Sequence, residues 1–317
     1  MSLRLGLCCQ FLDAPIKFRV ATHKHLSTLD PIARRAKIVA IVRDNADALR
    51  RAVERCHALG IGAFRITSQI LPLATHPESG YRLADLDDES DGEVSRAFRD
   101  AGRLAGERGV RLTFHPDQFV VLNSEQERVV ESSLREMELQ GEIAALVGAD
   151  VITLHAGSSA GGVPAAIGRL ERALDSLAAR SPAAHARLAL ENDDRRFAPA
   201  DLLPLCERAG VPLVYDAHHH RCHGDGVGAE ETTARAVATW GEREPSFHVS
   251  SPRAGWGAGD PRPHADHVDP ADFPAAWLEH AARGSLTVDV EAKAKERAVL
   301  ALREALATGG TLPSDLR

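Results

Sequence analysis

Short apolar runs alternate regularly with longer segments of helical periodicity along this chain, and this alternation leaves few folds open. Eight runs have the length of a buried strand, at residues 3–8, 63–67, 110–115, 150–155, 187–191, 212–216, 246–250 and 286–291. Segments that we expect to be helices follow them, near 32–59, 91–108, 127–147, 163–180, 199–209, 229–240, 270–282 and 293–308. Eight successive strand–helix units are typical of a closed (β/α)8 barrel, the TIM barrel.

A doubly wound open sheet shares this alternation and is the structural alternative. Such a sheet usually has fewer strands and a glycine-rich first turn, whereas the first run here leads into Cys8-Cys9-Gln10-Phe11 without a GxGxxG pattern. No linker, internal repeat or low-complexity tract divides the chain. We therefore predict an α/β fold with a single domain over residues 1–317, folded as one TIM barrel.

A histidine or a carboxylate stands at the carboxyl end of six successive predicted strands. These residues are His115, His155, Glu191, Asp216, His248 and Glu291. Catalytic residues of TIM barrels come from these strand ends and the loops after them. Any one of the six could simply hydrogen-bond a neighbouring loop, but six on one rim would repel each other or lie unpaired unless cations lay between them.

Imidazole and carboxylate ligands without thiolates suit Mn, Fe or Zn, and this number of ligands implies two or three ions. The chain contains 15 histidines, more than its Phe and Tyr residues together. His76 and His264 lie in loops that could fold back to the rim, and of His218-His219-His220 we expect one side chain to point at the ions. A centre of this kind can hydrolyse a phosphodiester.

The cysteines and the chain's beginning bear on where the protein works. Five cysteines without a CxxC pair argue against a disulfide framework and against a thiolate zinc finger. The chain's first residues lack the pattern of a signal peptide, and no apolar run approaches the length of a membrane span. We therefore expect a cytoplasmic protein without membrane contact. The sequence says nothing of oligomeric state, and a monomer is the working expectation.

These residues together resemble the UV damage endonuclease family of metal-dependent, xylose-isomerase-like TIM barrels. The resemblance runs through nearly the whole chain and is strongest in four blocks that are specific in combination. They are residues 64–77, His115-Pro116-Asp117-Gln118-Phe119, Leu188-Ala189-Leu190-Glu191-Asn192-Asp193 and Val290-Glu291-Ala292-Lys293.

The resemblance implies an endonuclease for DNA repair, with up to three ions, often manganese, that hydrolyses the phosphodiester 5′ to a UV photoproduct or related lesion. Carried over residue by residue, the implied metal ligands are His76, His115, His155, Glu191, Asp216, His219, His248, His264 and Glu291. Among them we expect Glu191, Glu291, His115 and His248 to serve catalysis, with the two glutamates bridging ions. Gln118 and Phe119 match the residues that probe the lesion by wedging into the duplex.

Two positions depart from the family pattern. The family generally has a lysine, reported as a carboxylated metal ligand, two residues before the histidine of the seventh strand, and Ser246 stands there in this chain. A serine cannot form a carbamate. Near the first strand the family often has an aromatic residue that helps the lesion probe, where this chain has Leu7.

The net charge of −7 excludes a uniformly basic surface, so that DNA must meet local features. Between residues 17 and 44 seven Lys or Arg residues face two Asp residues. We expect Lys17 and Arg19 of this segment, together with Arg65, to bind DNA. With the two departures, the charge also leaves open an iron or manganese enzyme for a small molecule, namely an isomerase, a hydrolase or an oxygenase.

Overall fold

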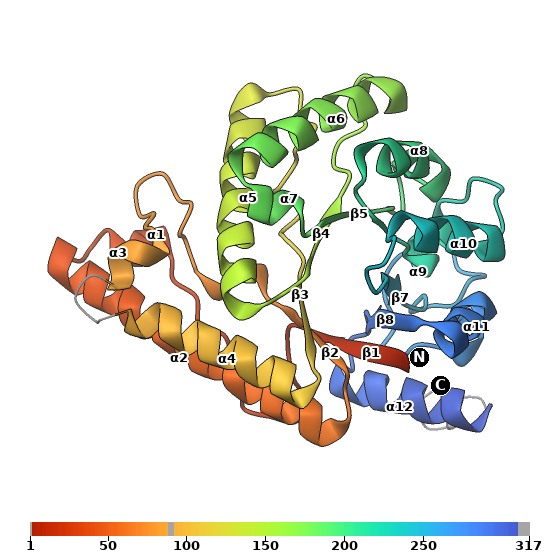
Figure 1. Cartoon of the computed structure of the whole chain (residues 1–317), viewed down its shortest axis with the longest axis horizontal. Helices are drawn as coiled ribbons and strands as arrows, with labels where there is room; N and C mark the ends of the chain where they lie inside the picture. Colours follow the sequence, from red (N-terminus) through yellow and green to blue (C-terminus); the bar gives the residue numbers. More distant parts are fainter. Residues whose placement is uncertain (1, 88–91, 310–317) are drawn as a thin grey trace.

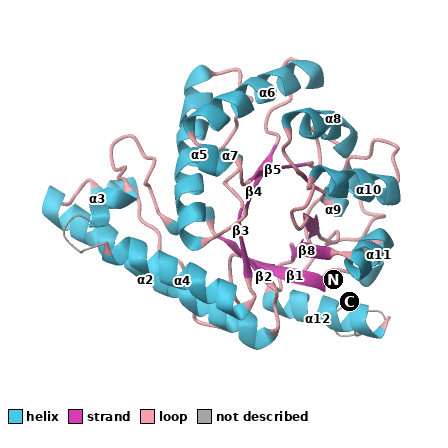
Figure 2. Ribbon diagram, in the orientation of Figure 1, coloured by secondary structure: helices cyan, strands magenta, loops and turns pink. Residues whose placement is uncertain are grey.

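Eight parallel strands form the centre of the molecule, and helices surround them (Figures 1 and 2). The computed structural model describes residues 2–87 and 92–309. The strands are β1 (Ser2–Cys8), β2 (Ala63–Ile66), β3 (Arg111–Phe114), β4 (Val151–His155), β5 (Leu188–Glu191), β6 (Leu213–Val214), β7 (Ser246–Val249) and β8 (Ser285–Val290). Each lies within one or two residues of the range that its apolar run predicts.

The order of the strands closes the sheet. The ladder runs β6-β5-β4-β3-β2-β1-β8-β7, so that the first strand pairs with the eighth. Its two outer strands meet through an isolated parallel bridge between Asp216 and His248, where the His248 amide donates to the Tyr215 carbonyl at 3.1 Å. The predicted TIM barrel is therefore confirmed, and a doubly wound open sheet is excluded.

Most of the long helices begin and end close to the predicted residues. They are α2 (Pro31–Leu59), α4 (Glu93–Arg108), α5 (Glu127–Val147), α6 (Val163–Arg180), α8 (Pro199–Ala209), α10 (Ala229–Thr239), α11 (Ala275–Arg283) and α12 (Glu296–Thr308). The first predicted residue of α4, residue 91, lies outside the described residues. Helices α2 and α4 run side by side along one flank of the barrel (Figure 1).

Two helices begin later than the periodicity predicts. Helix α11 begins at Ala275 because Phe273, which precedes Pro274, has an extended backbone; residues 270–272 instead form a short 3-10 turn, η2 (Pro270–Asp272). Helix α12 begins at Glu296 because Lys295 has a φ of 50° and is not helical. The amides of Lys293 and Ala294 donate to the carbonyls of Ala265 and Asp266 in the loop after β7.

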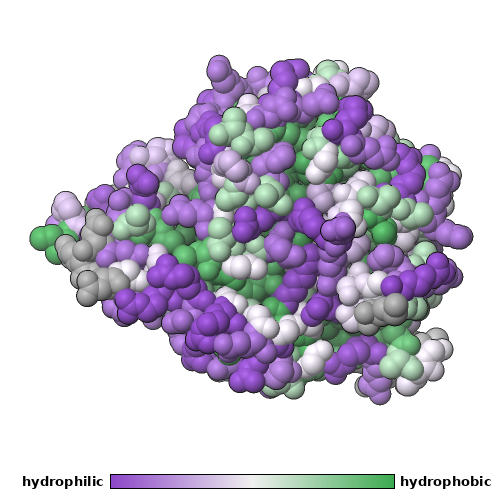
Figure 3. All heavy atoms as spheres, in the orientation of Figure 1, coloured by the Kyte–Doolittle hydropathy of each residue, from purple (hydrophilic) through white to green (hydrophobic). Residues whose placement is uncertain are grey.

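Five short elements were not predicted from the sequence: α1 (His23–Leu26), η1 (Ser68–Ile70), α3 (Leu83–Asp87), α7 (Pro182–His185) and α9 (Ala217–Cys222). The last of these bears on the site, since it follows directly on β6. Over the described residues no helix is both long and apolar enough to cross a membrane. Hydrophilic residues predominate on the face shown in Figure 3, with apolar residues visible between them.

Candidate metal centre

The six strand-end residues lie at one end of the barrel, and Glu191 stands at their centre. Because all eight strands are parallel, their carboxyl ends share one rim. Glu191 ends β5, is fully buried, and its carboxylate contacts imidazoles from four other segments of the chain. One buried carboxylate is therefore shared among four histidines.

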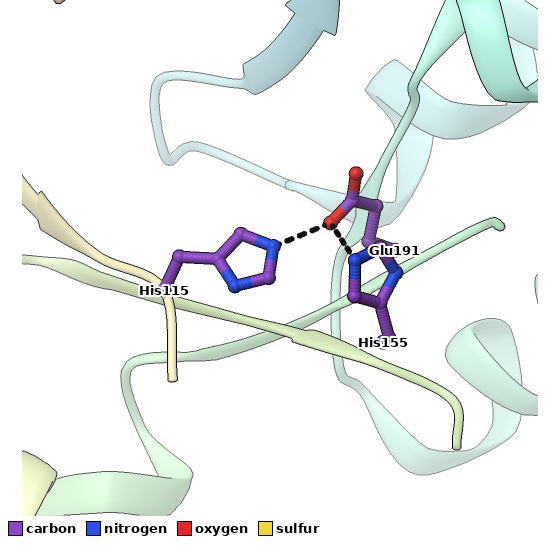
Figure 4. A group of neighbouring side chains, drawn as sticks. All are labelled: His115, His155 and Glu191. Carbon is purple, nitrogen blue, oxygen red and sulfur yellow. Dashed lines mark hydrogen bonds and ion pairs between the residues drawn. The ribbon is translucent and has the colours of Figure 1, made fainter. Parts of the chain in front are cut away.

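Each oxygen of Glu191 faces two histidines. Oε2 lies 2.9 Å from Nε2 of His115 and 3.6 Å from Nε2 of His155, and Figure 4 shows both rings pointing at this oxygen. Oε1 lies 2.9 Å from Nδ1 of His248 and 3.5 Å from Nδ1 of His219. The two oxygens thus define two neighbouring clusters of nitrogen and oxygen donors.

Among the described residues two groups of side chains are compact enough to hold a metal ion, and both include Glu191. In the first, donor atoms of His115, His155 and Glu191 lie within 4.8 Å of one another; in the second, those of Glu191, Asp216 and His248 do. Oδ2 of Asp216 is buried and accepts no hydrogen bond in the described part of the chain. A buried carboxylate oxygen without a donor fits a cation, and the mixed imidazole and carboxylate donors fit a divalent transition metal.

Local backbone structure positions Asp216 and His219. Asp216 is the N-cap of α9, and its Oδ1 accepts from the His219 amide at 2.7 Å. Asn192, the residue after Glu191, holds the Asp216 backbone from both sides, donating to its carbonyl at 2.9 Å and accepting from its amide at 3.0 Å. Strand β5 therefore positions both carboxylates.

The turn of α9 decides which residue of the His218–His220 run reaches the centre. His219 faces Glu191, while His218 lies 3.2 Å from the Arg262 carbonyl and His220 lies 2.9 Å from Oδ1 of Asp225. One of these three side chains was expected to point at the ions, and the structure brings His219 to Glu191. The reason for the separation is a helix, whose successive side chains diverge by about 100°.

The pKa values of the buried groups reflect this arrangement. Burial alone would raise the pKa of Glu191, but the imidazoles of His155 and His248 hold it well below its usual range. Burial would lower the pKa of His248, yet the carboxylates of Glu191 and Glu291 raise it to about 9. Burial dominates at His155 and lowers its pKa, and burial likewise raises the pKa of Asp216. The surrounding imidazoles thus keep Glu191 in its charged form, the form that can bind a cation.

Glu291 borders the second group. Its Oε1 lies 3.5 Å from Nδ1 of His248 and accepts a hydrogen bond from Arg65, and its Oε2 lies 3.7 Å from Nδ1 of His264. Arg65 was expected to contact DNA. The structure places its guanidinium largely inside the barrel, with a side chain 14% exposed and paired with Glu291.

His76 lies outside both groups. Its Nδ1 accepts from the amides of Glu78 and Ser79, and its ring stacks on that of His23 at a centroid distance of 4.5 Å. Nε2 is the nitrogen left to face a ligand. Its place among the implied metal ligands therefore stays a prediction.

Gln118 and Phe119 are exposed on the loop after β3, beside the centre. Phe119 is 76% exposed, and both residues line an open groove of about 690 Å³ that also reaches His155, His219 and His264. The same groove is lined by three arginines that were not predicted from the sequence: Arg195, Arg196 and Arg262. Arg195 and Arg196 lie in the loop after β5, and this position was the available signal for them.

The other predicted DNA contacts differ in their surroundings. Lys17 is exposed, whereas Arg19 pairs with Asp44 of helix α2. Arg43 is likewise paired, with Glu93. Part of the positive charge between residues 17 and 44 is thus neutralised within the protein.

The two departures from the family pattern are both buried. Leu7 lies in β1 with no exposed surface, so no aromatic side chain reaches the groove from that position. Ser246 begins β7 and is 1% exposed, and its Oγ has no hydrogen-bond partner in the described residues.

Comparison with known proteins assigns a family to this arrangement. The family model described as UV-endonuclease UvdE matches residues 3–312. The UV DNA damage endonuclease of Deinococcus radiodurans is 33% identical over 95% of this chain and 94% of its own length, and that of Bacillus velezensis is 28% identical over 94% and 91%.

Solved structures agree with these matches. The crystal structure of SacUVDE superimposes with a TM-score of 0.82 at 25% identity, covering 97% of this chain and 99% of the other. Endonuclease IV from Thermus thermophilus superimposes with a TM-score of 0.64 at 18% identity over 96% and 99%, a likeness of fold alone.

Proposed function

Because the chain belongs to the UV-endonuclease family, we propose that it is a DNA repair endonuclease that uses divalent metal ions to hydrolyse the phosphodiester 5′ to a UV photoproduct or related lesion. The observation that carries the proposal is the position of Glu191. Its carboxylate is shared by two groups of side chains that are compact enough to hold a metal ion, and the groove with the exposed Phe119 begins beside them.

His115, His155 and Glu191 would hold one ion, and Glu191, Asp216 and His248 a second. His219, His264 and Glu291 border these groups, and with His76 they would complete the ligands of two or three ions. Manganese is the proposed metal, with iron or zinc as alternatives. When bound, such ions supply a hydroxide nucleophile at neutral pH and stabilise the leaving oxygen.

The protein side chains keep the donor atoms in place. Glu191 and Glu291 offer two oxygens each, so each can serve two ions, while His115 and His248 each face Glu191 at 2.9 Å. Because Asn192 fixes the backbone of Asp216, the carboxylates are held in position before substrate arrives. Such preorganisation lowers the cost of reaching the reactive geometry.

DNA would lie in the groove beside the centre. Phe119 and Gln118 would enter the duplex at the lesion, where broken stacking lowers the cost of turning bases out. Arg196 is exposed, and in the described residues its side chain has no ion-pair partner, so its charge is available to a phosphate. Lys17 and Arg19 would contact phosphates of the DNA backbone away from the cut. Arg65 would contact DNA beside Glu291, the carboxylate with which it pairs.

The test is incision of an end-labelled duplex that carries one UV photoproduct, with the metal-stripped protein and with Mn²⁺, Mg²⁺, Zn²⁺ or Fe²⁺ added back. We expect one cut 5′ to the lesion with Mn²⁺, none in the undamaged duplex, and incision lower by about a thousandfold or more with the Glu191→Gln variant. No incision with any of these metals would refute the proposal. Tightly bound iron without salt-sensitive DNA binding would instead support the small-molecule enzyme.

A further inference from the structure

A buried carboxylate that the proposed chemistry does not use lies behind the metal centre. Asp289, in β8, is 1% exposed, and its Oδ1 accepts no hydrogen bond in the described part of the chain. It lies two residues before Glu291 and belongs to neither metal-binding group. A buried carboxylate without a hydrogen-bond donor is costly and requires an explanation.

The register of three neighbouring strands places Asp289 beside His248. Asp289 pairs with Gly6 of β1 on one side and with His248 of β7 on the other. A Cβ at Gly6 would lie 2.1 Å from Oδ1 of Asp289. The carboxylate therefore occupies space that exists only because residue 6 has no side chain.

The two nitrogens of His248 face different carboxylates. Nδ1 lies 2.9 Å from Oε1 of Glu191, in the metal centre, and Nε2 lies 3.8 Å from Oδ2 of Asp289. Nε2 is buried and has no hydrogen-bond partner among the described residues. An imidazole that offers the lone pair of Nδ1 to a metal must carry its proton on Nε2, which then needs an acceptor.

We propose that Asp289 is a positioning residue for the metal centre: its carboxylate accepts the Nε2–H of His248 and so fixes the tautomer and ring orientation in which Nδ1 faces the ion. This inference rests on the proposed function, in that it takes His248 as a metal ligand. The two atoms lie 3.8 Å apart, the distance of an ion pair, and a charge-assisted hydrogen bond between them would require a separation of about 2.8 Å. A carboxylate behind a ligating histidine raises the basicity of the ligand and holds its ring.

The test measures metal binding without DNA. Wild type, Asp289→Asn and Gly6→Ala are stripped of metal and titrated with Mn²⁺ against a chelating dye, and their Co²⁺ forms are compared by visible absorption. Asparagine keeps the shape and removes the charge; alanine at position 6 keeps the charge and displaces the carboxylate. We expect both variants to bind Mn²⁺ about 10- to 100-fold more weakly, with a changed Co²⁺ spectrum.

Ser246→Ala is the matched control, since Ser246 is equally buried and lies two residues from His248 on the same strand. It should leave affinity and spectrum unchanged. Wild-type affinity and spectrum in both Asp289→Asn and Gly6→Ala would overturn the inference, and a thermal melt of each metal-free variant shows whether the measured protein is folded.

The readouts keep this inference separate from the proposed function. If wild type cuts damaged DNA while Asp289→Asn and Gly6→Ala both bind metal normally, the positioning role fails and the function stands. If wild type binds metal and Asp289→Asn weakens it, but no DNA is cut, the positioning role stands and the function fails.

Discussion

Replacing Glu191 with glutamine tests the shared carboxylate. Glutamine has nearly the same shape but no charge, and it offers one acceptor oxygen where Glu191 has two. Four imidazole nitrogens lie between 2.9 and 3.6 Å from the Glu191 oxygens. The substitution therefore removes the negative charge around which these rings gather.

The magnitude follows from the burial and the contacts. Glu191 is fully buried, and removing one partner of a buried charge pair costs about 3–5 kcal/mol. We expect the metal-free variant to be destabilised by the lower part of that range, because the amide oxygen still accepts one hydrogen bond. Both metal groups lose their common ligand, so incision should fall by about a thousandfold or more, which corresponds to about 4 kcal/mol.

The assay combines denaturant unfolding of the metal-free protein, metal content of the reconstituted protein, and incision of damaged duplex. Asp225→Asn is a matched control, since it breaks another 2.9 Å pair between a histidine and a carboxylate, His220 and Asp225, outside both metal groups. It should lower stability while metal content is kept. If Glu191→Gln retained both ions and cut within tenfold of wild type, the reasoning would be refuted.

Four further outcomes are expected. Phe119→Ala should leave thermal stability almost unchanged, since the ring is 76% exposed. It should lower incision at the lesion by about 5- to 150-fold, which corresponds to the loss of one base–aromatic stack. Incision equal to that of wild type would show that Phe119 does not wedge into the duplex. Arg196→Ala should weaken the salt dependence of DNA binding: the slope of the logarithm of the binding constant against the logarithm of the salt concentration should decrease in magnitude by about one. Arg172→Ala, in helix α6 and outside the groove, is the control and should leave this slope unchanged. Ser246→Ala should change the free energy of unfolding by less than about 1 kcal/mol, because a hydroxyl without a partner is removed. The pKa of His248 is raised to about 9, so below that pH the imidazole must lose a proton before Nδ1 can bind metal. If one proton is displaced, Mn²⁺ affinity should fall about tenfold for each pH unit below 9. An Mn²⁺ affinity that did not change between about pH 6 and pH 8 would contradict this expectation.

The fold could be predicted because each strand is a short apolar run and each long helix has its own periodicity. The late starts of α11 and α12 depend on features outside that periodicity. Pro274 keeps Phe273 extended, and the backbone amides before Glu296 are used by a loop far away in sequence. Helix α9 was missed because a run of three histidines has no apolar pattern.

The clustering of the candidate metal ligands could be anticipated from strand ends, since parallel strands in a barrel deliver their last residues to one rim. Other features required coordinates. Arg65 was expected to meet DNA, but only the geometry shows its pairing with Glu291. Asp289 looks like an interruption of an apolar run until the register sets it between Gly6 and His248.

In the proposed metal centre one carboxylate, that of Glu191, serves two metal ions. Anomalous diffraction at the manganese edge, on crystals of the protein grown with Mn²⁺, measures this directly. We expect a manganese peak at each oxygen of Glu191: one bonded to Oε2 beside His115 and His155, and another bonded to Oε1 beside Asp216 and His248. A map without manganese on either oxygen of Glu191 would contradict the account.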